Sequence, residues 1–220
     1  MDSTQTTVFI VEDHPVMREG YESLIGLEPH LTLVGTASSA EDALTQICDL
    51  RPDVVVMDLQ LPGVSGVELI KRLEALDLPS RILVVSAHEE ALYGERTLRA
   101  GAKGYLMKDE SALCIVDAIR KVKAGGIYLS DELESRLVGG WIDNNGVPSS
   151  PAERLTDREL EVFDLIGHGQ TTREMAETLG LSPKTIESHR VNIKRKMGAE
   201  TVPELIRQAV LWVQSPMLEP

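Results

Sequence analysis

The sequence lacks several features that would assign a protein to a class at once. Cysteine is scarce, with two among 220 residues. Because Cys48 and Cys114 lie in separate helical patterns, we expect small buried thiols and neither a disulfide nor a metal site. No apolar run approaches the roughly 20 residues of a membrane helix, and the first one, Val8–Val11, is too short for the core of a signal peptide. We expect a cytoplasmic protein with no membrane partner.

Positive charge is also scarce, since 22 Lys and Arg stand against 35 Asp and Glu, for a formal net charge of −13. Taken alone, this balance argues against binding of nucleic acid. The distribution is uneven, however, because the segment Lys184–Lys196 contains five basic residues and a single acidic one, Glu187. One locally basic segment therefore lies within an acidic protein.

Short apolar runs alternate with helical periodicity between Thr7 and Ala124. In the helical stretches apolar residues recur every three or four positions, as Met17, Tyr21 and Leu24 do. This alternation is typical of a parallel sheet with helices on both faces. We predict an α/β domain built on a five-stranded, parallel, doubly wound sheet of the flavodoxin-like kind. Its expected strands are Val8–Val11, Leu31–Ala37, Val54–Asp58, Arg81–Ser86 and Gly104–Met107.

The chain changes character after this domain. Turn and linker residues, mainly Gly, Asn, Pro and Ser, concentrate in one stretch, which also has room for one short helix over Ser130–Val138 with Ser130 as its cap. We place the first domain at residues 1–126, the linker at 127–151 and a second domain at 152–220.

The sequence of the second domain predicts helices throughout, and capping residues mark where these helices begin. Three starts carry the Thr-x-x-Glu capping box, in which side chains satisfy the amides of the first turn. The fourth has a capping Ser followed by Pro at the first helical position. The four starts are Thr156/Glu159, Thr171/Glu174, Ser182/Pro183 and Thr201/Glu204. We predict an all-α domain of four helices.

Ionisable and hydroxyl side chains fall at the carboxyl ends of the predicted strands, where ligands of doubly wound sheets bind. Clustered carboxylates repel one another unless a cation binds among them, and Mg²⁺ prefers oxygen ligands. A lysine and Mg²⁺ together can neutralise a phosphoryl group while an aspartate attacks it. The candidate residues are Glu12 and Asp13 after the first strand, Asp58 after the third, Ser86 after the fourth and Lys108 after the fifth.

Other interpretations of these residues are open. A single Asp at the end of a strand is usually solvated or caps a helix, so only the joint pattern favours chemistry. A nucleotide site is less favoured, because the turn from Glu12 to Pro15 contains no glycine. His14 and His88 suggest a metal, but His14 stands where a helix would open with Pro15, and neither histidine has a partner at metal-binding spacing.

These residues stand in segments that resemble the receiver domain of two-component response regulators, over roughly residues 6–126. The resemblance implies that Asp58 accepts a phosphoryl group, and that Ser86 and Lys108 bind it. It also implies that the aromatic Tyr105 repacks when Ser86 moves. The matching segments are Phe9–Pro15, Val55–Gly63, Val84–Ala87 and Gly101–Lys108.

The same resemblance implies Mg²⁺ as a cofactor. Its ligands would be Glu12, Asp13, Asp58 and the backbone carbonyl of Gln60. Two positions depart from the commoner pattern: Glu12 replaces an aspartate, and Asp109 follows Lys108 where many receivers have proline, so no cis peptide is expected there. Neither departure removes the acidic pocket.

A helical wheel of Ser182–Gly198 has one polar, basic face. On this face Val191 can contact a thymine methyl, Glu187 can accept a hydrogen bond from cytosine N4, and Ser188 can meet either kind of base edge. A solvated amphipathic helix explains the same pattern, but a preceding helix and a turn at Gly180 favour a helix-turn-helix. Further candidate DNA contacts, of which the basic ones suit phosphates, are Lys184, Thr185, Asn192, Lys194, Arg195 and Lys196.

The region from about residue 152 to 214 resembles the LuxR-type helix-turn-helix of NarL/FixJ-type regulators. The resemblance places base contacts at Glu187, Ser188 and Val191, and it implies dimers on paired half-sites with Thr201–Val213 as the dimer helix. Glu187 departs from the basic residues often found at its position. The matching segments are Leu155–Val162, Gly169–Ala176, Leu181–His189 and Lys196–Gly198.

The order of the two domains predicts a DNA-binding transcription regulator that is switched by phosphorylation of Asp58. Its expected partners are double-stranded DNA, a sensor histidine kinase and, when active, a second copy of the chain. One alternative is an atypical regulator whose receiver is a phosphorylation-independent interaction or dimerisation module. A second is a phosphohydrolase, but this needs an acid-base residue two positions beyond Asp58, and Gln60 cannot ionise. We therefore expect no enzyme beyond self-phosphorylation and self-dephosphorylation at Asp58.

Overall fold

The computed structural model describes residues 5–88, 90–110, 112–143 and 151–214. The chain divides into two compact units, Met1–Ile142 and Asp143–Pro220, and each is considered by itself. Within the described ranges, every helix is too short or too polar to cross a lipid bilayer.

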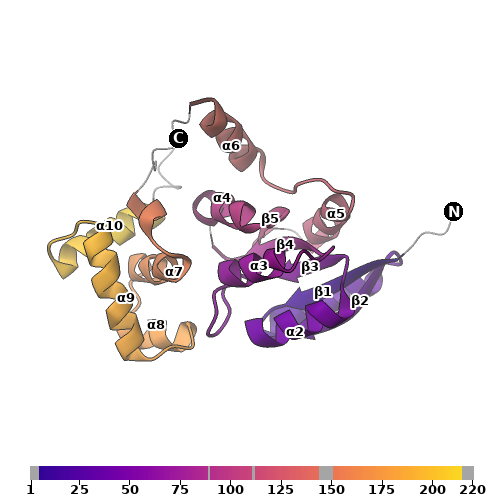
Figure 1. Ribbon diagram of the computed structural model, residues 1–220, viewed down its shortest axis with the longest axis horizontal. Coiled ribbons are helices and arrows are strands. Elements are labelled where there is room, and N and C mark those ends of the chain that lie inside the picture. Colours follow the sequence, from indigo (N-terminus) through magenta and orange to yellow (C-terminus); the bar gives the residue numbers. More distant parts are fainter. Residues whose placement is uncertain (1–4, 89, 111, 144–150, 215–220) are drawn as a thin grey trace. The chain divides into compact units, whose positions relative to one another are not determined.

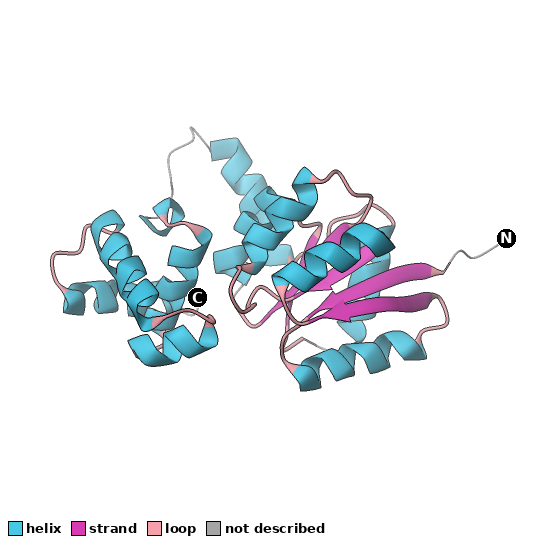
Figure 2. Ribbon diagram, turned by 60° about the horizontal axis from the view of Figure 1, so that its bottom comes forward, coloured by secondary structure: helices cyan, strands magenta, loops and turns pink. Residues whose placement is uncertain are grey.

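The first unit is built on a five-stranded parallel sheet (Figure 2). The strand order is β2-β1-β3-β4-β5, which is the doubly wound, flavodoxin-like order that the sequence predicted. β1 begins two residues earlier than expected, and β3 ends before Asp58 and not at it. The strands are β1 Thr6–Val11, β2 Leu31–Ala37, β3 Val54–Met57, β4 Arg81–Ser86 and β5 Gly104–Met107.

Helices cover both faces of this sheet (Figure 1). On one face lie α1 (Pro15–Leu27) and α5 (Ala112–Lys123), and on the other lie α2 (Ala40–Leu50), α3 (Gly66–Ala75) and α4 (Glu90–Ala100). All four residues of β3 are buried, as expected of a strand that is covered on both sides. Apolar packing therefore lies on both faces of the sheet, while backbone pairing sets the register of the strands.

The two turns that flank the first and third strands are tightly specified. α1 begins at Pro15, with His14 in the preceding cap position, as the sequence predicted. α3 begins after Ser65, whose hydroxyl accepts a hydrogen bond from the Glu68 amide. Gly66 lies so close to the preceding strand end that a Cβ atom there would approach the Asp58 carbonyl oxygen to 2.8 Å. Glycine is required where this loop returns past Asp58.

The chain after α5 stays attached to the sheet. Tyr128 forms a parallel bridge with Gly104, and its carbonyl accepts a hydrogen bond of 2.8 Å from the Tyr105 amide. This contact covers the outer edge of β5, where unpaired backbone groups would otherwise face solvent. α6 (Asp131–Asp143) follows, longer than the predicted Ser130–Val138 helix, and the Ser130 hydroxyl accepts from the Leu133 amide at 3.2 Å. Residues 144–150 of the predicted linker lie outside the described residues.

The second unit is helical along its described length. Phe163 of α7 (Asp157–Gly167) packs against Trp212 of α10 (Val202–Gln214), with ring centroids 5.5 Å apart. Ile186 and Ile193 of α9 (Pro183–Lys196) are fully buried. The capping boxes predicted at the starts of α7 and α8 are both present. At the start of α10 the box is only half formed, because the Glu204 carboxylate accepts from the Glu200 amide. The elements are a 3₁₀ turn Pro151–Arg154, α7 Asp157–Gly167, α8 Thr172–Thr178, α9 Pro183–Lys196 and α10 Val202–Gln214.

Candidate functional site

The acidic residues meet at the point where the strand order of the sheet reverses, between β1 and β3. These strands are neighbours, and the Asp58 amide donates to the Val11 carbonyl at 2.9 Å, so Glu12 and Asp58 leave the sheet side by side. On the far side of β3, the Lys108 amide donates to the Ser86 carbonyl at 2.8 Å. Backbone pairing alone therefore brings the predicted acids and the lysine to one edge, where doubly wound sheets bind ligands.

Lys108 joins two of the carboxylates directly. Its Nζ lies 2.7 Å from Oε2 of Glu12 and 2.8 Å from Oδ2 of Asp58. The Glu12 and Asp58 side chains are only 1% and 3% exposed, and that of Lys108 is 16% exposed. Asp13 completes the group, since one oxygen from each of the three carboxylates lies within 4.8 Å of the others. The structure thus brings together Glu12, Asp13, Asp58 and Lys108.

Three carboxylates with one lysine leave the pocket with excess negative charge. Burial raises the pKa of Glu12, and the charge of Asp58 raises it further. Burial and the Asp58 charge likewise raise the pKa of Asp13. Burial alone would lower the pKa of Lys108, but its interactions with Asp58 and Glu12 raise it above the usual value. Ionisation of Glu12 and Asp13 is therefore less favourable than in water, and a bound cation would favour their ionised forms.

The pocket suits a hard divalent cation. Oδ1 of Asp58 is buried and accepts no hydrogen bond from any residue that the structure describes. A buried carboxylate oxygen without a donor is costly unless a cation or water lies beside it. Together with the neighbouring oxygens of Glu12 and Asp13, this atom supplies the all-oxygen donor set that Mg²⁺ prefers.

The predicted switch residues lie at the end of β4 and on β5. Ser86 is fully buried, and its hydroxyl accepts a hydrogen bond of 3.2 Å from the His88 amide. Tyr105 is 1% exposed, and its hydroxyl donates to the His88 carbonyl at 2.8 Å. Both predicted residues therefore hold the same short segment after β4. Gln60 lies in the loop that follows β3, two residues beyond Asp58.

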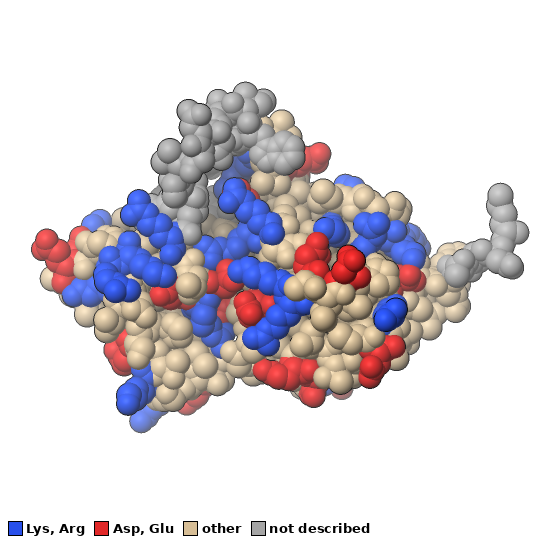
Figure 3. All heavy atoms as spheres, in the orientation of Figure 1, with Lys and Arg blue, Asp and Glu red and all other residues tan. Residues whose placement is uncertain are grey.

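In the second unit, α8 and α9 form two helices joined by a short turn in which Gly180 has a φ of +62°. The outward face of α9 is polar except for Val191, which is 66% exposed. Lys184, Glu187 and Ser188 are exposed as well. Lys and Arg side chains gather over the part of this unit that α9 and α10 occupy (Figure 3). This is the polar, basic face that the helical wheel predicted.

Comparison with known proteins decides the family. The sequence profile of the response regulator receiver domain matches residues 8–120, and that of the luxR family of bacterial regulatory proteins matches residues 153–209. The chain belongs to the response regulator family. With a receiver followed by a LuxR-type domain, it is a DNA-binding regulator of a two-component system.

Relatives support this assignment along nearly the whole chain. The transcriptional regulatory protein MctR of Rhizobium johnstonii is 35% identical and covers 92% of both chains. The oxygen regulatory protein NreC of Staphylococcus carnosus is 31% identical over 92% of this chain and 96% of its own. Among solved structures, the receiver domain of NarL from Mycobacterium tuberculosis is 33% identical, with a TM-score of 0.53, over 55% of this chain and 98% of its own. RcsB from Salmonella enterica, solved bound to a promoter with a phosphomimetic, is 21% identical with a TM-score of 0.61, over 94% and 98% of the chains, and shows the fold.

Two residues near the response regulator's acidic pocket were not singled out from the sequence. Nη1 of Arg18 donates to the Glu12 backbone carbonyl at 2.8 Å and so fixes the turn after β1. The Tyr21 hydroxyl is buried without a partner among the described residues, and burial raises the pKa of Tyr21 to about 12, with the charges of Lys108, Glu12 and Asp58 also acting on it. Helical periodicity placed Tyr21 on the inner face of α1, but it carries no information about what its hydroxyl approaches.

Some predicted DNA contacts of the response regulator have partners within its own domain. The Thr185 hydroxyl lies 2.8 Å from that of Ser182, the Ser188 hydroxyl donates to the Lys184 carbonyl at 3.0 Å, and Arg195 donates to Asn192 at 3.5 Å. Lys194 lies half-buried in the last turn of α9.

Lys196, which the sequence suggested as a phosphate contact, also has a partner within its own domain. Its Nζ lies 2.5 Å from Oε2 of Glu159 on α7, and the Glu159 side chain is only 6% exposed. The pairing holds the end of α9 against α7. Because the two residues are far apart in sequence, local pattern could not reveal this structural role.

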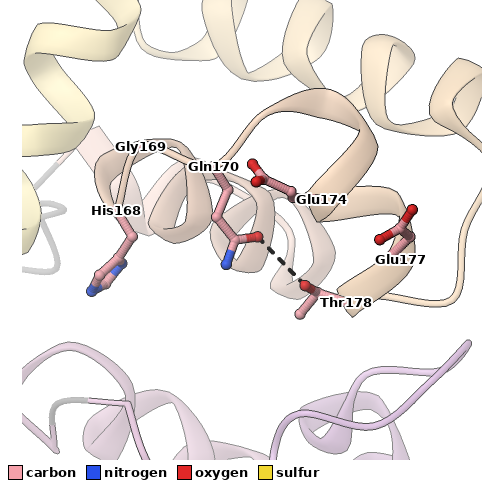
Figure 4. A pocket seen from close by; sticks show the side chains of 6 residues that line it. All are labelled: His168, Gly169, Gln170, Glu174, Glu177 and Thr178. Atoms are coloured by element: carbon pink, nitrogen blue, oxygen red, sulfur yellow. Dashed lines mark hydrogen bonds between the residues drawn. The ribbon is translucent and has the colours of Figure 1, made fainter.

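A shallow, open hollow of about 390 Å³ lies at the turn between α7 and α8 (Figure 4). Gln170 and Thr178 point toward each other across it, joined by a hydrogen bond of 3.5 Å from the Thr178 hydroxyl. Small-molecule sites are concave, largely apolar and enclosed, so this polar hollow is not a ligand site of that kind. Its lining residues are His168, Gly169, Gln170, Glu174, Glu177 and Thr178.

Proposed function

We propose that this response regulator accepts a phosphoryl group on Asp58 and that the modification controls DNA binding by α9. The observation that carries the proposal is the contact of one lysine with two buried carboxylates, Lys108 with Glu12 and Asp58, at 2.7 and 2.8 Å. The donor is a sensor histidine kinase or a small phosphodonor. Because the protein binds DNA, we infer that it acts in the cytoplasm.

A carboxylate oxygen of Asp58 attacks phosphorus, and the bond between phosphorus and the donor nitrogen or oxygen breaks, so that the leaving group keeps the electron pair. Lys108 lies beside Asp58 and supplies one positive charge to the transferred group. Glu12, Asp13, Asp58 and the Gln60 backbone carbonyl would hold Mg²⁺, which would supply the remaining positive charge. Positioning and electrostatics therefore provide most of the rate.

The switch begins at Ser86. In the structure its hydroxyl accepts from the His88 amide, while Tyr105 donates to the His88 carbonyl. A phosphoryl group on Asp58 is a stronger acceptor for the Ser86 hydroxyl, so Ser86 turns toward it and releases the His88 amide. The segment after β4 and Tyr105 then repack, which shifts the population between two states of the receiver.

DNA binding uses the outward face of α9 in the major groove. Glu187, Ser188 and Val191 face the bases. Phosphate and flanking contacts come from Lys184, Thr185, Asn192, Lys194 and Arg195. We infer a homodimer in the active state, because α10 exposes apolar side chains along its length: Val202, Ile206 and Leu211 are 48%, 40% and 47% exposed. A second copy covers this face and places two recognition helices on paired half-sites.

No independent enzymatic activity is part of the proposal. Gln60 cannot ionise to activate water two positions beyond Asp58, so only self-phosphorylation and slow self-dephosphorylation at Asp58 are expected. The complete set of pocket residues also argues against a receiver that works without phosphorylation.

The test compares the affinity of the full-length chain for its operator with and without beryllofluoride and Mg²⁺. We expect a change of roughly 5- to 150-fold, the usual range of coupling between two sites. Asp58→Asn should abolish the change, whereas Asp109→Asn, on an exposed residue outside the pocket, should keep it. If the wild-type chain bound its operator equally tightly with and without beryllofluoride and Mg²⁺, the proposed switch would be overturned. That result would favour a receiver that acts as a phosphorylation-independent module.

A further inference from the structure

A hydrogen-bonded chain of three side chains links α8 to the recognition helix. The Thr172 hydroxyl donates to Oε1 of Glu187 at 2.6 Å, and Nη1 of Arg190 donates to the Thr172 hydroxyl at 3.4 Å. A hydroxyl has one proton to donate and two lone pairs that accept, so both contacts form at once. Thr172 is the first residue of α8, so it ties the recognition helix to the helix before it.

This chain restricts a side chain that would otherwise be free to rotate. Glu187 is exposed on α9, and a glutamate in that position normally samples several rotamers. The Thr172 contact uses Oε1 alone, and no residue that the structure describes donates to Oε2 of Glu187. One carboxylate oxygen is therefore fixed, and the other remains available as an acceptor on the outward face of α9.

A fixed acceptor selects among the base pairs. In the major groove only the N4 amino group of cytosine and the N6 amino group of adenine donate hydrogen bonds. Adenine presents the acceptor N7 beside its amino group, which repels a carboxylate, whereas cytosine presents a C–H there. Guanine and thymine offer acceptors, so a carboxylate at this place disfavours both.

Arg190 makes the negative charge tolerable near DNA. A carboxylate that approaches phosphates is repelled by them, and the guanidinium of Arg190 lies one hydroxyl away from Glu187. The positive charge offsets part of this repulsion without occupying Oε2. The arrangement therefore allows the Glu187 carboxylate to accept a hydrogen bond from a base, although basic residues are common at this position.

We propose that Thr172 is a specificity-determining positioning residue, which orients the Glu187 carboxylate to select one cytosine in each half-site. The inference rests on the proposed function, in that α9 must enter the major groove.

The test selects binding sites from a pool of duplexes with randomised half-sites, using the full-length chain activated by beryllofluoride and Mg²⁺. The same selection is run with Thr172→Val, which replaces the hydroxyl with a methyl group, with Thr172→Ser, which retains the hydroxyl, and with Glu187→Gln. Affinities are then measured for the selected duplex and for its three single-base variants at the cytosine position. Thermal unfolding of each variant accompanies these measurements.

We expect the wild-type chain and Thr172→Ser to prefer cytosine at one position by about tenfold or more. Thr172→Val should reduce that preference to roughly two- to threefold while leaving the preferences at other positions unchanged. Glu187→Gln should change the preferred base toward adenine, which glutamine contacts through both N6 and N7. A loss of fold alone would lower all preferences together and leave this selective pattern absent.

Two results would overturn the inference. If Thr172→Val keeps the full cytosine preference, Thr172 has no positioning role. If Glu187→Gln keeps it, Glu187 does not read that base. Failure of the proposed function is distinguishable, because in that case the unmodified chain would enrich no sequence from the pool.

Discussion

Each unit of this response regulator buries a glutamate beside a lysine. In the receiver, Glu12 is 1% exposed and lies 2.7 Å from Lys108. In the DNA-binding domain, the Glu159 side chain is 6% exposed and lies 2.5 Å from Lys196. Burial works against the ionised form in both cases. Yet the pKa of Glu12 is raised, whereas that of Glu159 is lowered.

The surroundings explain the difference. Glu12 shares its lysine with Asp58, and the negative charge of Asp58 opposes its ionisation. Burial opposes the ionisation of Glu159 as well, but hydrogen bonds from Lys196 and from the amide and hydroxyl of Thr156 outweigh it. A buried acid whose hydrogen bonds and charge are satisfied therefore stabilises the fold. A buried acid in a cluster with too few positive charges instead forms a site for a cation.

Removal of the phosphoacceptor should change the chemistry of the pocket most. Asp58→Asn deletes the phosphoacceptor, so we expect no phosphoryl incorporation from acetyl phosphate in the presence of Mg²⁺. Intact-protein mass spectrometry measures the added phosphoryl group directly. Asp109→Asn is the matched control and should incorporate it at the normal rate. Incorporation into Asp58→Asn equal to that of the unmodified chain would place the chemistry elsewhere.

Substitution of Lys108 and of Lys196 should affect the phosphorylation rate differently. Lys108→Met removes a positive charge from the phosphoryl site, and we expect phosphorylation of Asp58 to slow by about 10²-fold, as for the loss of one preorganised donor. Lys196→Met should leave that rate within about twofold and weaken the DNA-binding domain. Initial rates with acetyl phosphate check both variants. Equal rates in the two variants would remove the functional distinction between the lysines.

Glu159→Gln tests the structural acid. It removes the charge that pairs with Lys196 and weakens the cap of α7, so we expect unfolding of the DNA-binding domain to become easier by about 1–3 kcal/mol at neutral pH. Because the folded-state pKa of Glu159 is lowered, its contribution is present above the usual pKa of a glutamate and is lost as the pH falls through the folded value. Urea unfolding followed by Trp212 fluorescence, in a Trp141→Phe background, measures both effects. Unchanged stability would mean that the ion pair contributes nothing.

Glu12→Gln should change the free energy of unfolding in the opposite direction to Glu159→Gln, and its effect should be the smallest of those predicted. A raised folded-state pKa means that the stability contribution of Glu12 is full below the usual pKa of a glutamate and is lost as the pH rises through the folded value. At neutral pH without Mg²⁺ the neutral glutamine should therefore stabilise the receiver, by on the order of 1 kcal/mol. It should also reduce the stabilisation that added Mg²⁺ confers. Destabilisation in the absence of Mg²⁺ would contradict the contrast with Glu159.

Much of this comparison was predictable from the sequence, because the relevant information is local. Apolar runs identified the five strands, and the order of strand ends placed Glu12, Asp58 and Lys108 at one edge of the sheet. The capping boxes at Thr156 and Thr171 fixed two helix starts through neighbours only three residues away.

The rest depends on contacts between distant segments. The pairing of Lys196 with Glu159 and the link from Thr172 to Glu187 join different helices, and no periodicity encodes which side chains meet there. The attachment of Tyr128 to β5 likewise arises from backbone pairing beyond the end of α5. In each case the residue type was visible in the sequence, but its partner was set by tertiary packing.

We propose that the pocket carries excess negative charge, which a divalent cation neutralises before phosphoryl transfer. Carboxyl ¹³C NMR of the full-length chain, titrated with acid in the absence and presence of Mg²⁺, tests it most directly. We predict that Glu12 and Asp13 titrate above the usual values of their residue types without Mg²⁺, that Mg²⁺ lowers both pKa values, and that Glu159 titrates low under both conditions. If both pocket acids titrate at or below their usual values and do not respond to Mg²⁺, the pocket has no excess negative charge for a cation to neutralise.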